Sequence, residues 1–582
     1  MIDIKDLSFE YFTRDEYNYL SEMITAINEI NFTAEDGEFV VIAGRNGSGK
    51  STFARILNRL LVPIDGQVSI YGLDALNPEN IYEIRKKVSM IFQNPDSQII
   101  GSIVEEDIAF GMENLGFSRR KMKENINKAI EAVGLSGKGQ DILKRKVSEL
   151  SGGEKQKLVI AGALAMEPKC LVLDESTSML DPFSRKEIID ILIKQKTVTV
   201  ILITHIMTEL LYADTVYVFD KGKICLKGTP KKIFSDGKKL EQLGLELPQS
   251  VLLANRLYNE GIIKKKNLMT VDDIVNEMST EYYYKTKENI AMPAIIKENI
   301  KIDPTKAILV NDISFSYGKK NVLQNIKLEI NKGEFVGVIG ETSAGKTTFI
   351  QSIAGLLKPQ KGSVYVDGVE IYDKNTDQIE VNKKIGFLFQ YPEQQLFAKN
   401  VYEDVLYGVK NLGLTKVEAE KRAYESIELV GLSQEVYDMS MNRLSGGQLR
   451  RVALAGVIAM KPEYLILDEP TAGLDPAGGE EMLNIISALR EELNVTIIMV
   501  THDIDSIVKY ADRILLMENG RITQDGRPST VLHNNYISTN NKENLPTIMR
   551  FMFELKNKGF DIPCNCVDED ECVKIIKERI GC

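Results

Sequence analysis

The chain has 582 residues, too many for one hydrophobic core, and its 27% charged and 43% hydrophobic residues are ordinary for a globular protein. A formal net charge of -11 argues against nucleic-acid binding, because neutralising phosphates needs a basic face. No apolar run approaches the roughly 18–20 residues that cross a bilayer, and Met1-Ile-Asp-Ile-Lys5 lacks the apolar core of a signal peptide, so we expect a cytoplasmic protein.

The first nucleotide-binding signal is an apolar strand, Phe39-Val-Val-Ile42, followed by Gly44-Arg-Asn-Gly47-Ser-Gly49-Lys50-Ser51. Strand, G-x-x-x-x-G-K-[ST] and helix in this order are typical of a phosphate-binding loop. Its glycines let backbone N–H groups converge on phosphates, the helix N-terminus adds partial positive charge, and Lys50 neutralises further. The hydroxyl of Ser51 is suited to Mg²⁺.

Two elements flank this loop. Upstream, Tyr11 ends the motif Ser8-Phe-Glu-Tyr11; its ring can stack on adenine, and a packing role stays open. Downstream, Gln93 lies in Ile91-Phe-Gln-Asn-Pro-Asp-Ser-Gln98. A glutamine alone is uninformative, but a Phe-Gln-x-Pro-[Asp/Glu] element that recurs in both halves, between the loop and the next motif, indicates function.

Leu150-Ser-Gly-Gly-Glu154 begins the next predicted helix. Ser-x-x-Glu is a capping box, so Ser151 can be no more than a helix N-cap. An anion site at a glycine-exposed helix start is compatible with capping. Because the second half repeats the Leu-Ser-Gly-Gly core, we favour a functional site at Ser151, Gly152 and Gly153.

The apolar strand Leu171-Val-Leu173 then ends in Asp174-Glu175. The Asp suits a water-mediated contact to Mg²⁺, and the adjacent Glu can polarise an attacking water. An isolated acidic strand end would favour mere solvation, but a phosphate-binding loop precedes this pair in each half. His205 follows a further strand and has a counterpart at the same repeat position, whereas His533 has none.

These elements occur a second time, in the same order. The second loop reads Gly340-Glu-Thr-Ser-Ala-Gly345-Lys346-Thr347 after Phe335-Val-Gly-Val-Ile339, and Ser343 in place of Gly47 predicts a slightly remodelled loop. Lys50 and Lys346 are 296 positions apart, and the later pairs are offset by 294 to 297, so we expect one shared fold. The remaining second-half elements are Tyr317, Gln390 in Leu388-Phe-Gln-Tyr-Pro-Glu-Gln-Gln395, Leu444-Ser-Gly-Gly-Gln448, Asp468-Glu469 and His502.

Short β-branched runs such as Val200-Ile-Leu-Ile203 and Thr496-Ile-Ile-Met-Val500 alternate with helical periodicity. Near-continuous apolar strands indicate a parallel sheet covered on both faces, with ligands at the carboxyl ends of the strands. We predict an α/β fold of two tandem P-loop NTPase domains, each with a helical C-terminal extension. The predicted segments are 1–237 (the first copy), its extension 238–281, a linker 282–305, 306–535 (the second copy) and its extension 536–582.

The two copies also differ in detail. Tyr11 to Gly37 is ten residues longer than Tyr317 to Gly333, and a longer surface hairpin is favoured over a functional insertion. Four cysteines crowd the C-terminus as C-x-C-x5-C-x9-C. Because this spacing is not the paired C-x-x-C of common zinc sites, free thiols are favoured over a metal site.

Together these elements resemble the ATP-binding cassette (ABC) ATPases over nearly the whole chain. The Walker A loop, Q-loop, Leu-Ser-Gly-Gly signature, Walker B carboxylates, D-loop (Leu180-Asp181 and Leu474-Asp475) and switch histidine stand in family order. The resemblance implies ATP hydrolysis with Mg²⁺. It further implies that two cassettes close head to tail, so that Lys50 faces Ser445 to Gly447 and Lys346 faces Ser151 to Gly153.

The resemblance carries the site residues over position by position. Because both copies keep the Walker B glutamate and the histidine, we predict two hydrolytic sites. The catalytic set is Glu175, Glu469, His205, His502, Gln93 and Gln390, and the metal set is Ser51, Gln93, Asp174, Thr347, Gln390 and Asp468. The nucleotide-binding set is Tyr11, Gly44, Asn46, Gly47, Ser48, Gly49, Lys50, Ser51, Thr52, Ser151, Gly152, Gly153, Asp181, Tyr317, Gly340, Thr342, Ser343, Ala344, Gly345, Lys346, Thr347, Thr348, Ser445, Gly446, Gly447 and Asp475.

A narrower resemblance is to the two ATPase subunits of energy-coupling factor (ECF) transporters. The first copy looks like one of these subunits in its segment Phe-Gln-Asn-Pro-Asp-Ser-Gln98, and the second copy looks like the other in Phe-Gln-Tyr-Pro-Glu-Gln-Gln-Leu-Phe397. The chain looks like both subunits fused in tandem. This resemblance implies uptake of a vitamin or metal ion through an integral membrane coupling subunit and a substrate-binding membrane subunit. It places the protein peripherally, on the inner face of the cell membrane. Ile99-Ile100 and Leu396-Phe397 are candidate docking residues, with a core role left open.

The rival hypothesis is a soluble twin-cassette ATPase that acts on the ribosome or on DNA. Ribosome-acting members would have a long charged helical arm between the cassettes, and DNA-repair types would have zinc-finger insertions or coiled coils. The stretch between the copies shows neither, and instead repeats the C-terminal extension before a short linker. We therefore favour a transporter motor.

Overall fold

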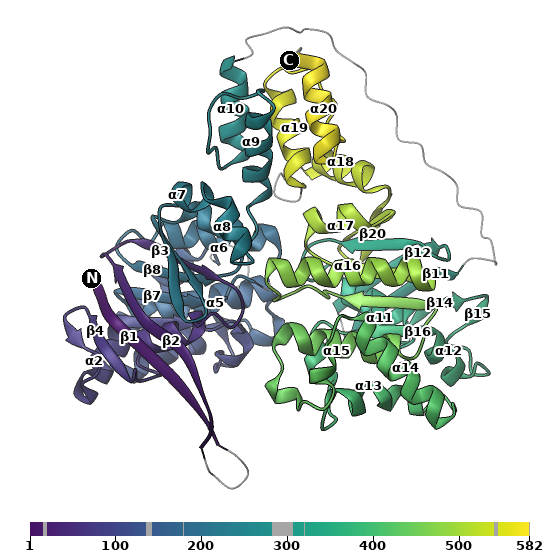
Figure 1. The fold of residues 1–582 in the computed structure, drawn as a ribbon, viewed down its shortest axis with the longest axis horizontal. Coiled ribbons are helices and arrows are strands. Elements are labelled where there is room, and N and C mark those ends of the chain that lie inside the picture. The colour runs from purple at the N-terminus through teal and green to yellow at the C-terminus, as the bar shows by residue number, and fades with distance from the viewer. Residues whose placement is uncertain are drawn as a thin grey trace. The chain divides into compact units, whose positions relative to one another are not determined.

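A computed structural model describes residues 1–14, 20–135, 142–178, 180–281, 307–318, 320–539 and 545–580 (Figure 1). The chain forms two compact units, one holding Met1–Leu252 and the other most of Leu253–Cys582. The expected linker at 282–305 lies outside the described residues. Among the helices that are described, none is both long and apolar enough to cross a membrane.

The first copy contains two sheets. A six-stranded sheet in the order β10-β9-β3-β8-β7-β6 is parallel except for its edge strand β10, and a four-stranded antiparallel sheet has the order β2-β1-β4-β5. The strands are β1 (Ile2–Arg14), β2 (Leu20–Ala34), β3 (Phe39–Gly44), β4 (Asp65–Ile70), β5 (Leu73–Asp74), β6 (Val88–Ile91), β7 (Cys170–Asp174), β8 (Thr199–Thr204), β9 (Thr215–Asp220) and β10 (Lys223–Gly228). The helices are α1 (Lys50–Leu57), α2 (Ile81–Lys87), α3 (Val104–Asn114), α4 (Arg119–Ala132), α5 (Gly152–Ala165), α6 (Pro182–Ile193), α7 (Pro230–Phe234) and α8 (Gly237–Gln242).

The second copy repeats this topology strand for strand, in the orders β16-β17-β18-β13-β19-β20 and β12-β11-β14-β15. Its strands are β11 (Ile308–Tyr317), β12 (Lys320–Ile330), β13 (Phe335–Ile339), β14 (Lys361–Val366), β15 (Val369–Glu370), β16 (Ile385–Leu388), β17 (Tyr464–Asp468), β18 (Thr496–Val500), β19 (Arg513–Glu518) and β20 (Arg521–Gly526). Its helices are α11 (Lys346–Ile353), α12 (Gln378–Lys384), α13 (Val401–Lys410), α14 (Lys416–Leu429), α15 (Gly446–Ile458), α16 (Pro476–Leu493), α17 (Ile504–Tyr510) and α18 (Pro528–Thr539). The predicted α/β fold of two tandem domains is confirmed.

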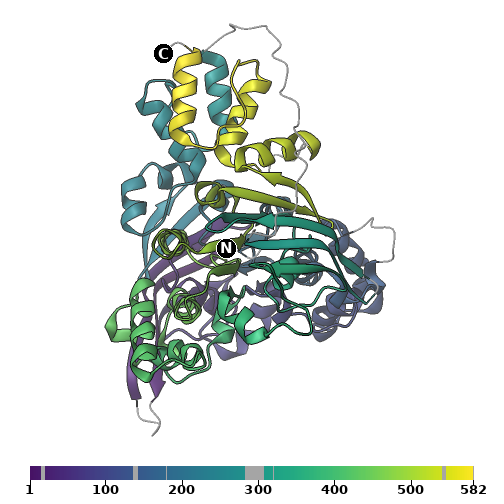
Figure 2. The same ribbon diagram turned by 90° about the vertical axis from the view of Figure 1, so that its right-hand side faces the viewer.

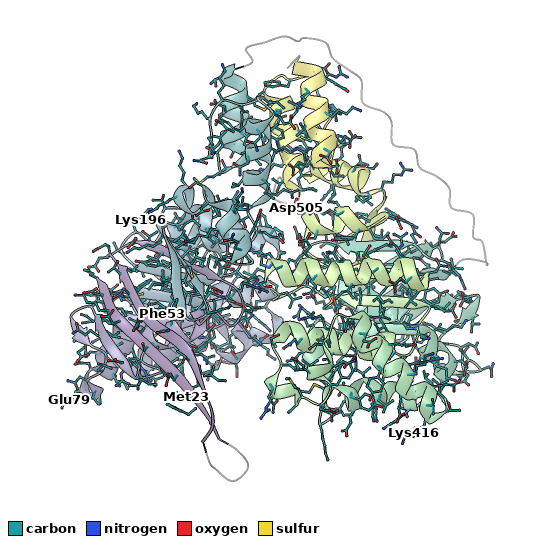
Figure 3. The ribbon with its side chains drawn as sticks, viewed as in Figure 1. Met23, Phe53, Glu79, Lys196, Lys416 and Asp505 are labelled. Carbon is teal, nitrogen blue, oxygen red and sulfur yellow. The ribbon has the colours of Figure 1, made fainter. Side chains whose placement is uncertain are left out.

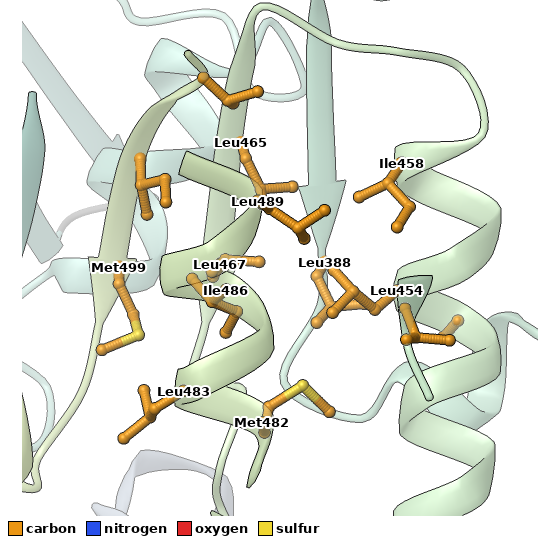
Figure 4. Close-up of a cluster of buried hydrophobic side chains, with 14 of the residues drawn as sticks. Leu388, Leu454, Ile458, Leu465, Leu467, Met482, Leu483, Ile486, Leu489 and Met499 are labelled. Carbon is orange, nitrogen blue, oxygen red and sulfur yellow. The ribbon is translucent and has the colours of Figure 1, made fainter. Parts of the chain in front are cut away.

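Strand β17 shows why these apolar runs form a doubly covered sheet. Side chains alternate across a strand; Leu465 and Leu467 enter one hydrophobic core, while Tyr464 and Ile466 enter the core on the other face. Helices α15 and α16 close the first of these cores, through residues such as Leu454 and Ile486 (Figure 4). In the first copy, the fully buried Phe53 of α1 lies in the core that corresponds to the second of these, on the face of Tyr464 and Ile466 (Figure 3).

The longer hairpin of the first copy is also confirmed. Strands β1 and β2 span 13 and 15 residues, against 10 and 11 for β11 and β12. Their pairing continues past Tyr11↔Ile24 to Arg14↔Leu20, whereas the second hairpin ends at Tyr317↔Lys320. The added residues therefore lengthen a two-stranded ribbon beyond the tyrosine without changing the sheet.

The helical extensions share one hydrophobic core, which we call the helical module. It consists of α9 (Gln249–Asn259), α10 (Val271–Glu281), α19 (Thr547–Asn557) and α20 (Glu569–Ile580), which lie side by side in both views (Figures 1 and 2). Charged pairs also link the two extensions: Arg256 contacts Glu569 and Asp570, and Lys577 Nζ lies 2.5 Å from Glu260 Oε2. The fully buried side chains of the helical module include Leu253, Leu257, Ile274, Met278, Ile548, Phe551, Met552, Leu555 and Ile576.

Helix α19 is buried on two sides. Ile548, Phe551 and Met552 enter the core of the helical module, while Met549 and Phe553 enter that of the second copy. At its start, the Asp505 carboxylate accepts hydrogen bonds from Thr547 N at 2.9 Å and Thr547 Oγ1 at 3.2 Å (Figure 3 labels Asp505). Since burial outweighs these bonds, it raises the pKa of Asp505 to about 6.

Three of the four C-terminal cysteines lie close to these helices. Cys564, Cys566 and Cys572 are buried free thiols, and Cys572 Sγ lies 3.5 Å from Met552 Sδ. Cys582, the last of the sequence pattern, lies outside the described residues. Within the described part of the chain, no three His, Cys, Asp or Glu side chains gather as a metal site.

Candidate functional site

Each phosphate-binding loop joins a central parallel strand to a helix that begins at the lysine. The residue before the lysine, Gly49 or Gly345, has a φ of 100°. A Cβ atom would lie 2.4 Å from Ala26 O at Gly49 and 2.8 Å from Val322 O at Gly345. Only glycine combines this left-handed backbone with so close a contact, so both positions require it.

The lysines are anchored on their own loops. Lys50 Nζ donates to Gly44 O at 2.7 Å and Arg45 O at 2.8 Å, and Lys346 Nζ donates to Gly340 O at 2.6 Å and Glu341 O at 3.0 Å. Burial lowers the pKa of Lys50, against the opposing charges of Glu175 and Asp174. Both ammonium groups are thus positioned at the mouth of their loop.

Hydroxyl and carboxylate oxygens meet beside each lysine. Ser51 Oγ donates to Asp174 Oδ1 at 2.8 Å, and Thr347 hydrogen-bonds to Asp468 in the second copy. Burial raises the pKa of Asp174, and it raises that of Asp468 to about 6. Oδ1 of Asp468 is buried and has no hydrogen-bond partner. Hard oxygen donors with one unsatisfied buried oxygen fit Mg²⁺, which takes few protein ligands beside phosphates.

In the first copy, two predicted catalytic side chains and the loop lysine lie around the carboxylate of a third predicted catalytic residue, Glu175. Glu175 Oε2 lies 3.4 Å from Gln93 Nε2 and 3.6 Å from His205 Nδ1, and Glu175 Oε1 lies 3.7 Å from Lys50 Nζ. Burial would raise the pKa of Glu175, but His205 and Lys50 together outweigh it and lower the pKa. The group is therefore ionised near neutral pH, as a base that orients water must be.

In the second copy, the histidine lies closer to the glutamate than in the first. Glu469 Oε2 lies 2.8 Å from His502 Nδ1 and accepts a bond from His502 N at 3.4 Å. Both glutamates have a left-handed backbone, with φ of 49° at Glu175 and 50° at Glu469. Such strain in a non-glycine residue gathers at functional sites. Gln390 follows β16 in the place that Gln93 takes after β6.

The Leu-Ser-Gly-Gly segments form the expected capping boxes. Ser151 Oγ accepts from Glu154 N at 3.3 Å while Glu154 Oε2 accepts from Ser151 N at 2.9 Å, and Ser445 and Gln448 make the same pair of bonds. Gly152 and Gly446 are the first residues of α5 and α15. The capping serine binds the N–H of Glu154 or Gln448, so the N–H groups of the first glycines remain at the exposed helix start. Helix capping and anion binding at the signature are therefore compatible.

Several other residues of the predicted nucleotide-binding set also have described contacts or positions. The Tyr11 hydroxyl lies 3.2 Å from Thr52 Oγ1, and Tyr11 packs edge-on against Phe9; Tyr317 packs in the same way against Phe315 and is 55% exposed. Asp181 caps α6, accepting from Ser184 N at 2.9 Å, and Asp475 directly precedes α16. The remaining members lie in the loops or in the first turns of α1 and α11: Asn46, Ser48, Thr342, Ala344 and Thr348.

Ser343 takes the place of Gly47 in the second loop, and its backbone is strained where that of glycine is not. Its φ is 73°, close to the 79° of Gly47, so the second loop keeps the shape of the first instead of being remodelled here. A Cβ atom at Gly47 would meet nothing within 4 Å. Serine therefore fits the space at this position but adopts a backbone conformation that costs an L-residue about 1–2 kcal/mol.

We expect Ser343→Gly to stabilise the second copy by about 0.5–1 kcal/mol, since relief of backbone strain exceeds the chain entropy that glycine loses. Gly47→Ser should destabilise the first copy by about 1 kcal/mol. The free energy of unfolding of both variants, measured by denaturant titration, checks these two predictions. A less stable Ser343→Gly would show instead that the Ser343 hydroxyl makes a stabilising contact.

The structure adds two functional candidates that we did not identify from the sequence. Asp107 Oδ1 accepts from Ile100 N and Gly101 N at 2.8 and 2.9 Å, and Asp404 Oδ1 accepts from the equivalent Phe397 N and Ala398 N at 3.0 and 2.9 Å. Each aspartate fixes the loop after a Q-loop. Their offset of 297, the same as that of the glutamines, is the signal that could have found them.

Comparisons with known proteins match the repeat. A family model described as ABC transporter matches residues 27–178 and 323–472. A protein of Methanosarcina mazei named as an ABC transporter ATP-binding protein is 34% identical over 94% of this chain and 94% of its own length. A Clostridium perfringens protein of the same description is 30% identical over 98% of each chain.

Two solved structures are similar to part of the chain. The structure of cbiO1 from Clostridium perfringens, described as part of the ABC transporter complex cbiONQ, is 35% identical, with a TM-score of 0.38 over 40% of this chain and 93% of its own. The ADP- and phosphate-bound cassette MJ0796 is 30% identical, with a TM-score of 0.35 over 38% of this chain and 98% of its own.

Proposed function

This chain belongs to the ABC transporter family and is an ATP-hydrolysing protein with two cassettes, and on that premise we propose that it is the motor of an ECF-type importer. It would couple hydrolysis in two composite sites to uptake of a vitamin or metal ion through an integral membrane coupling subunit and a substrate-binding membrane subunit. The ECF assignment rests on the two distinct Q-loop sequences and the paired extensions.

Both copies carry a full set of hydrolytic groups. The ionised Glu175 and its counterpart Glu469 each lie beside a histidine, and a lysine is anchored on each loop. We propose that Glu175 and Glu469 orient the attacking water, that the lysines stabilise phosphate charge, and that the signature serines and glycines bind ATP. Ser51 with Asp174, and Thr347 with Asp468, would hold Mg²⁺, which neutralises phosphate charge when bound.

The observation that carries the transport proposal is an exposed apolar residue at the same position of both copies. Ile100 is 65% exposed and Phe397 66% exposed, each on the loop that Asp107 or Asp404 fixes. Ile100 and Phe397 are therefore not core, whereas Leu396 packs against the core of the second copy.

An exposed aromatic residue occurs ten residues later in each copy. Phe110 is 43% exposed and Tyr407 53% exposed, and Tyr407 contacts Phe397 edge-on with ring centroids 4.7 Å apart. A rigid loop that presents apolar side chains to solvent marks an interaction surface. Since the loop directly succeeds the Q-loop, a partner docked there would be coupled to the nucleotide site.

Affinity purification of the full chain from detergent-solubilised membranes tests the proposal. We expect two integral membrane proteins to co-purify, and Ile100→Asp with Phe397→Asp to reduce their recovery. Asp replacing the exposed Val417 of α14 is a matched control, because it adds the same charge to an exposed apolar position elsewhere. Recovery of the wild-type chain alone, or with ribosomes or DNA, would count against transport.

A further inference from the structure

The two copies differ at the fifth position of the signature, which is Glu154 in the first and Gln448 in the second. Both side chains close the capping box in the same way, each accepting from the serine N–H at 2.9 Å. The hydrogen bond is the same, but the charge is not. A carboxylate at a helix N-terminus competes with any other anion for the donors and the positive potential there.

Arg145 compensates this charge in the first copy. Its Nη1 lies 3.2 Å from Glu154 Oε1, and the Glu154 side chain is only 12% exposed. Its Nη2 donates to Glu149 O at 2.6 Å, at the end of the turn η4 (Val147–Glu149) that leads into the signature. The guanidinium thus holds both the carboxylate and the preceding turn.

The nearest lysines of α5 are engaged elsewhere. Lys155 Nζ lies 2.6 Å from Asp96 Oδ1, and Lys157 Nζ lies 2.9 Å from Glu187 Oε2. Each of these lysines therefore has its own carboxylate partner.

The second copy has a neutral pair in the same place. Met439 is the counterpart of Arg145, since Val104 N donates to Arg145 O at 3.1 Å and Val401 N donates to Met439 O at 3.3 Å. Both side chains are half-buried. One backbone position therefore carries an arginine where the signature ends in a carboxylate, and a methionine where it ends in an amide.

We propose that Arg145 is a positioning residue of the first signature. It fixes the Glu154 carboxylate in the capping box and cancels its charge, so that Ser151, Gly152 and Gly153 can accept the polyphosphate of ATP. This inference rests on the proposed function, which assigns ATP binding to the signature. The second copy needs no such residue, because Gln448 closes the same box without charge.

A double-mutant cycle tests this with the ATP hydrolysis of the purified chain. Arg145→Met should raise KM for ATP about three- to tenfold, as expected of a unit charge a few ångströms away at a partly exposed site, with little change in kcat. In a Glu154→Gln background the same replacement should change KM less than twofold. The increase in KM caused by Arg145→Met should also be smaller at about 1 M salt, where the Debye length is about 3 Å. Arg145→Lys should recover part of the loss.

The second copy supplies a reciprocal test that does not depend on the fold of the Arg145 variant. Gln448→Glu places an uncompensated carboxylate beside Met439 and should raise KM, and adding Met439→Arg should lower it again. Equal effects of Arg145→Met in both backgrounds would show that Arg145 only supports the turn, and would overturn the proposal. So would a Gln448→Glu variant with an unchanged KM.

Failure of the proposed function can be recognised separately. The double-mutant cycle measures hydrolysis by the isolated chain. An absence of membrane partners would therefore contradict the proposed transport function without changing how the cycle is interpreted. If the signatures do not bind ATP, Ser151→Ala and Ser445→Ala would each leave KM unchanged. The premise would then fail before the role of Arg145 is judged.

Discussion

Glutamine in place of either Glu175 or Glu469 is expected to remove at least half of the ATP hydrolysis of the chain. The double replacement should lower it by about 10²–10⁴-fold, the contribution of a positioned general base. Glutamine keeps the shape of the side chain but cannot take a proton from water. ATP binding should persist, because the loops and lysines are untouched. Steady-state phosphate release and nucleotide binding, measured on each single variant and on the double variant, check this.

The matched control is Glu124→Gln, a replacement at an exposed glutamate of α4 that pairs with Arg120 in an i,i+4 contact. It should leave the rate unchanged. Full activity in either single variant would show that the altered site is not catalytic, and the prediction of two hydrolytic sites would then be wrong. A single variant that loses nearly all activity would show that the two sites work only together.

Phe551→Ala should destabilise the helical module by about 3–5 kcal/mol, the usual cost of emptying a buried aromatic site. Phe551 is fully buried in α19, in a core shared with α9 and α10. Amide hydrogen exchange should therefore show lost protection in α10 as well as in α19 and α20. The effect would cross some 270 residues of sequence, from Met278 to Ile548.

Lys556→Ala serves as the control, because it alters the exposed face of the same helix and should cost less than about 0.5 kcal/mol. Phe553→Ala provides a second comparison, since Phe553 enters the core of the second copy instead. Unchanged exchange in α10 after Phe551→Ala would mean that the two extensions are stable independently.

Features that repeat along the chain, or that obey local rules, could be predicted from the sequence. Strand-to-helix loops, capping boxes and apolar strands are short-range patterns, so the places of Lys50, Ser151 and Asp174 could be derived from spacing alone. Contacts between side chains far apart in sequence were not predictable in this way. The Arg145 pair with Glu154 depends on how a turn meets a helix, and the 2.8 Å contact of His502 with Glu469 depends on side-chain geometry.

The remodelled loop that Ser343 suggested was not found, for a physical reason. A hydrogen-bonded loop between a buried strand and a helix dictates the backbone, and the residue accepts the strain. The helical module was likewise foreseen only in part. A helical extension was predicted at the C-terminus of each copy, but the sequence does not say which apolar faces meet.

The shared core of the helical module has a consequence for synthesis on the ribosome. Helices α9 and α10 leave the ribosome about 270 residues before α19 begins, which at about 5–20 residues per second is roughly 15–50 s. During that interval their apolar faces have no partner, so this is when a chaperone would bind the nascent chain. Synthesis of α19 and α20 ends that interval, and in a chain truncated within the second copy the apolar faces of α9 and α10 would stay uncovered.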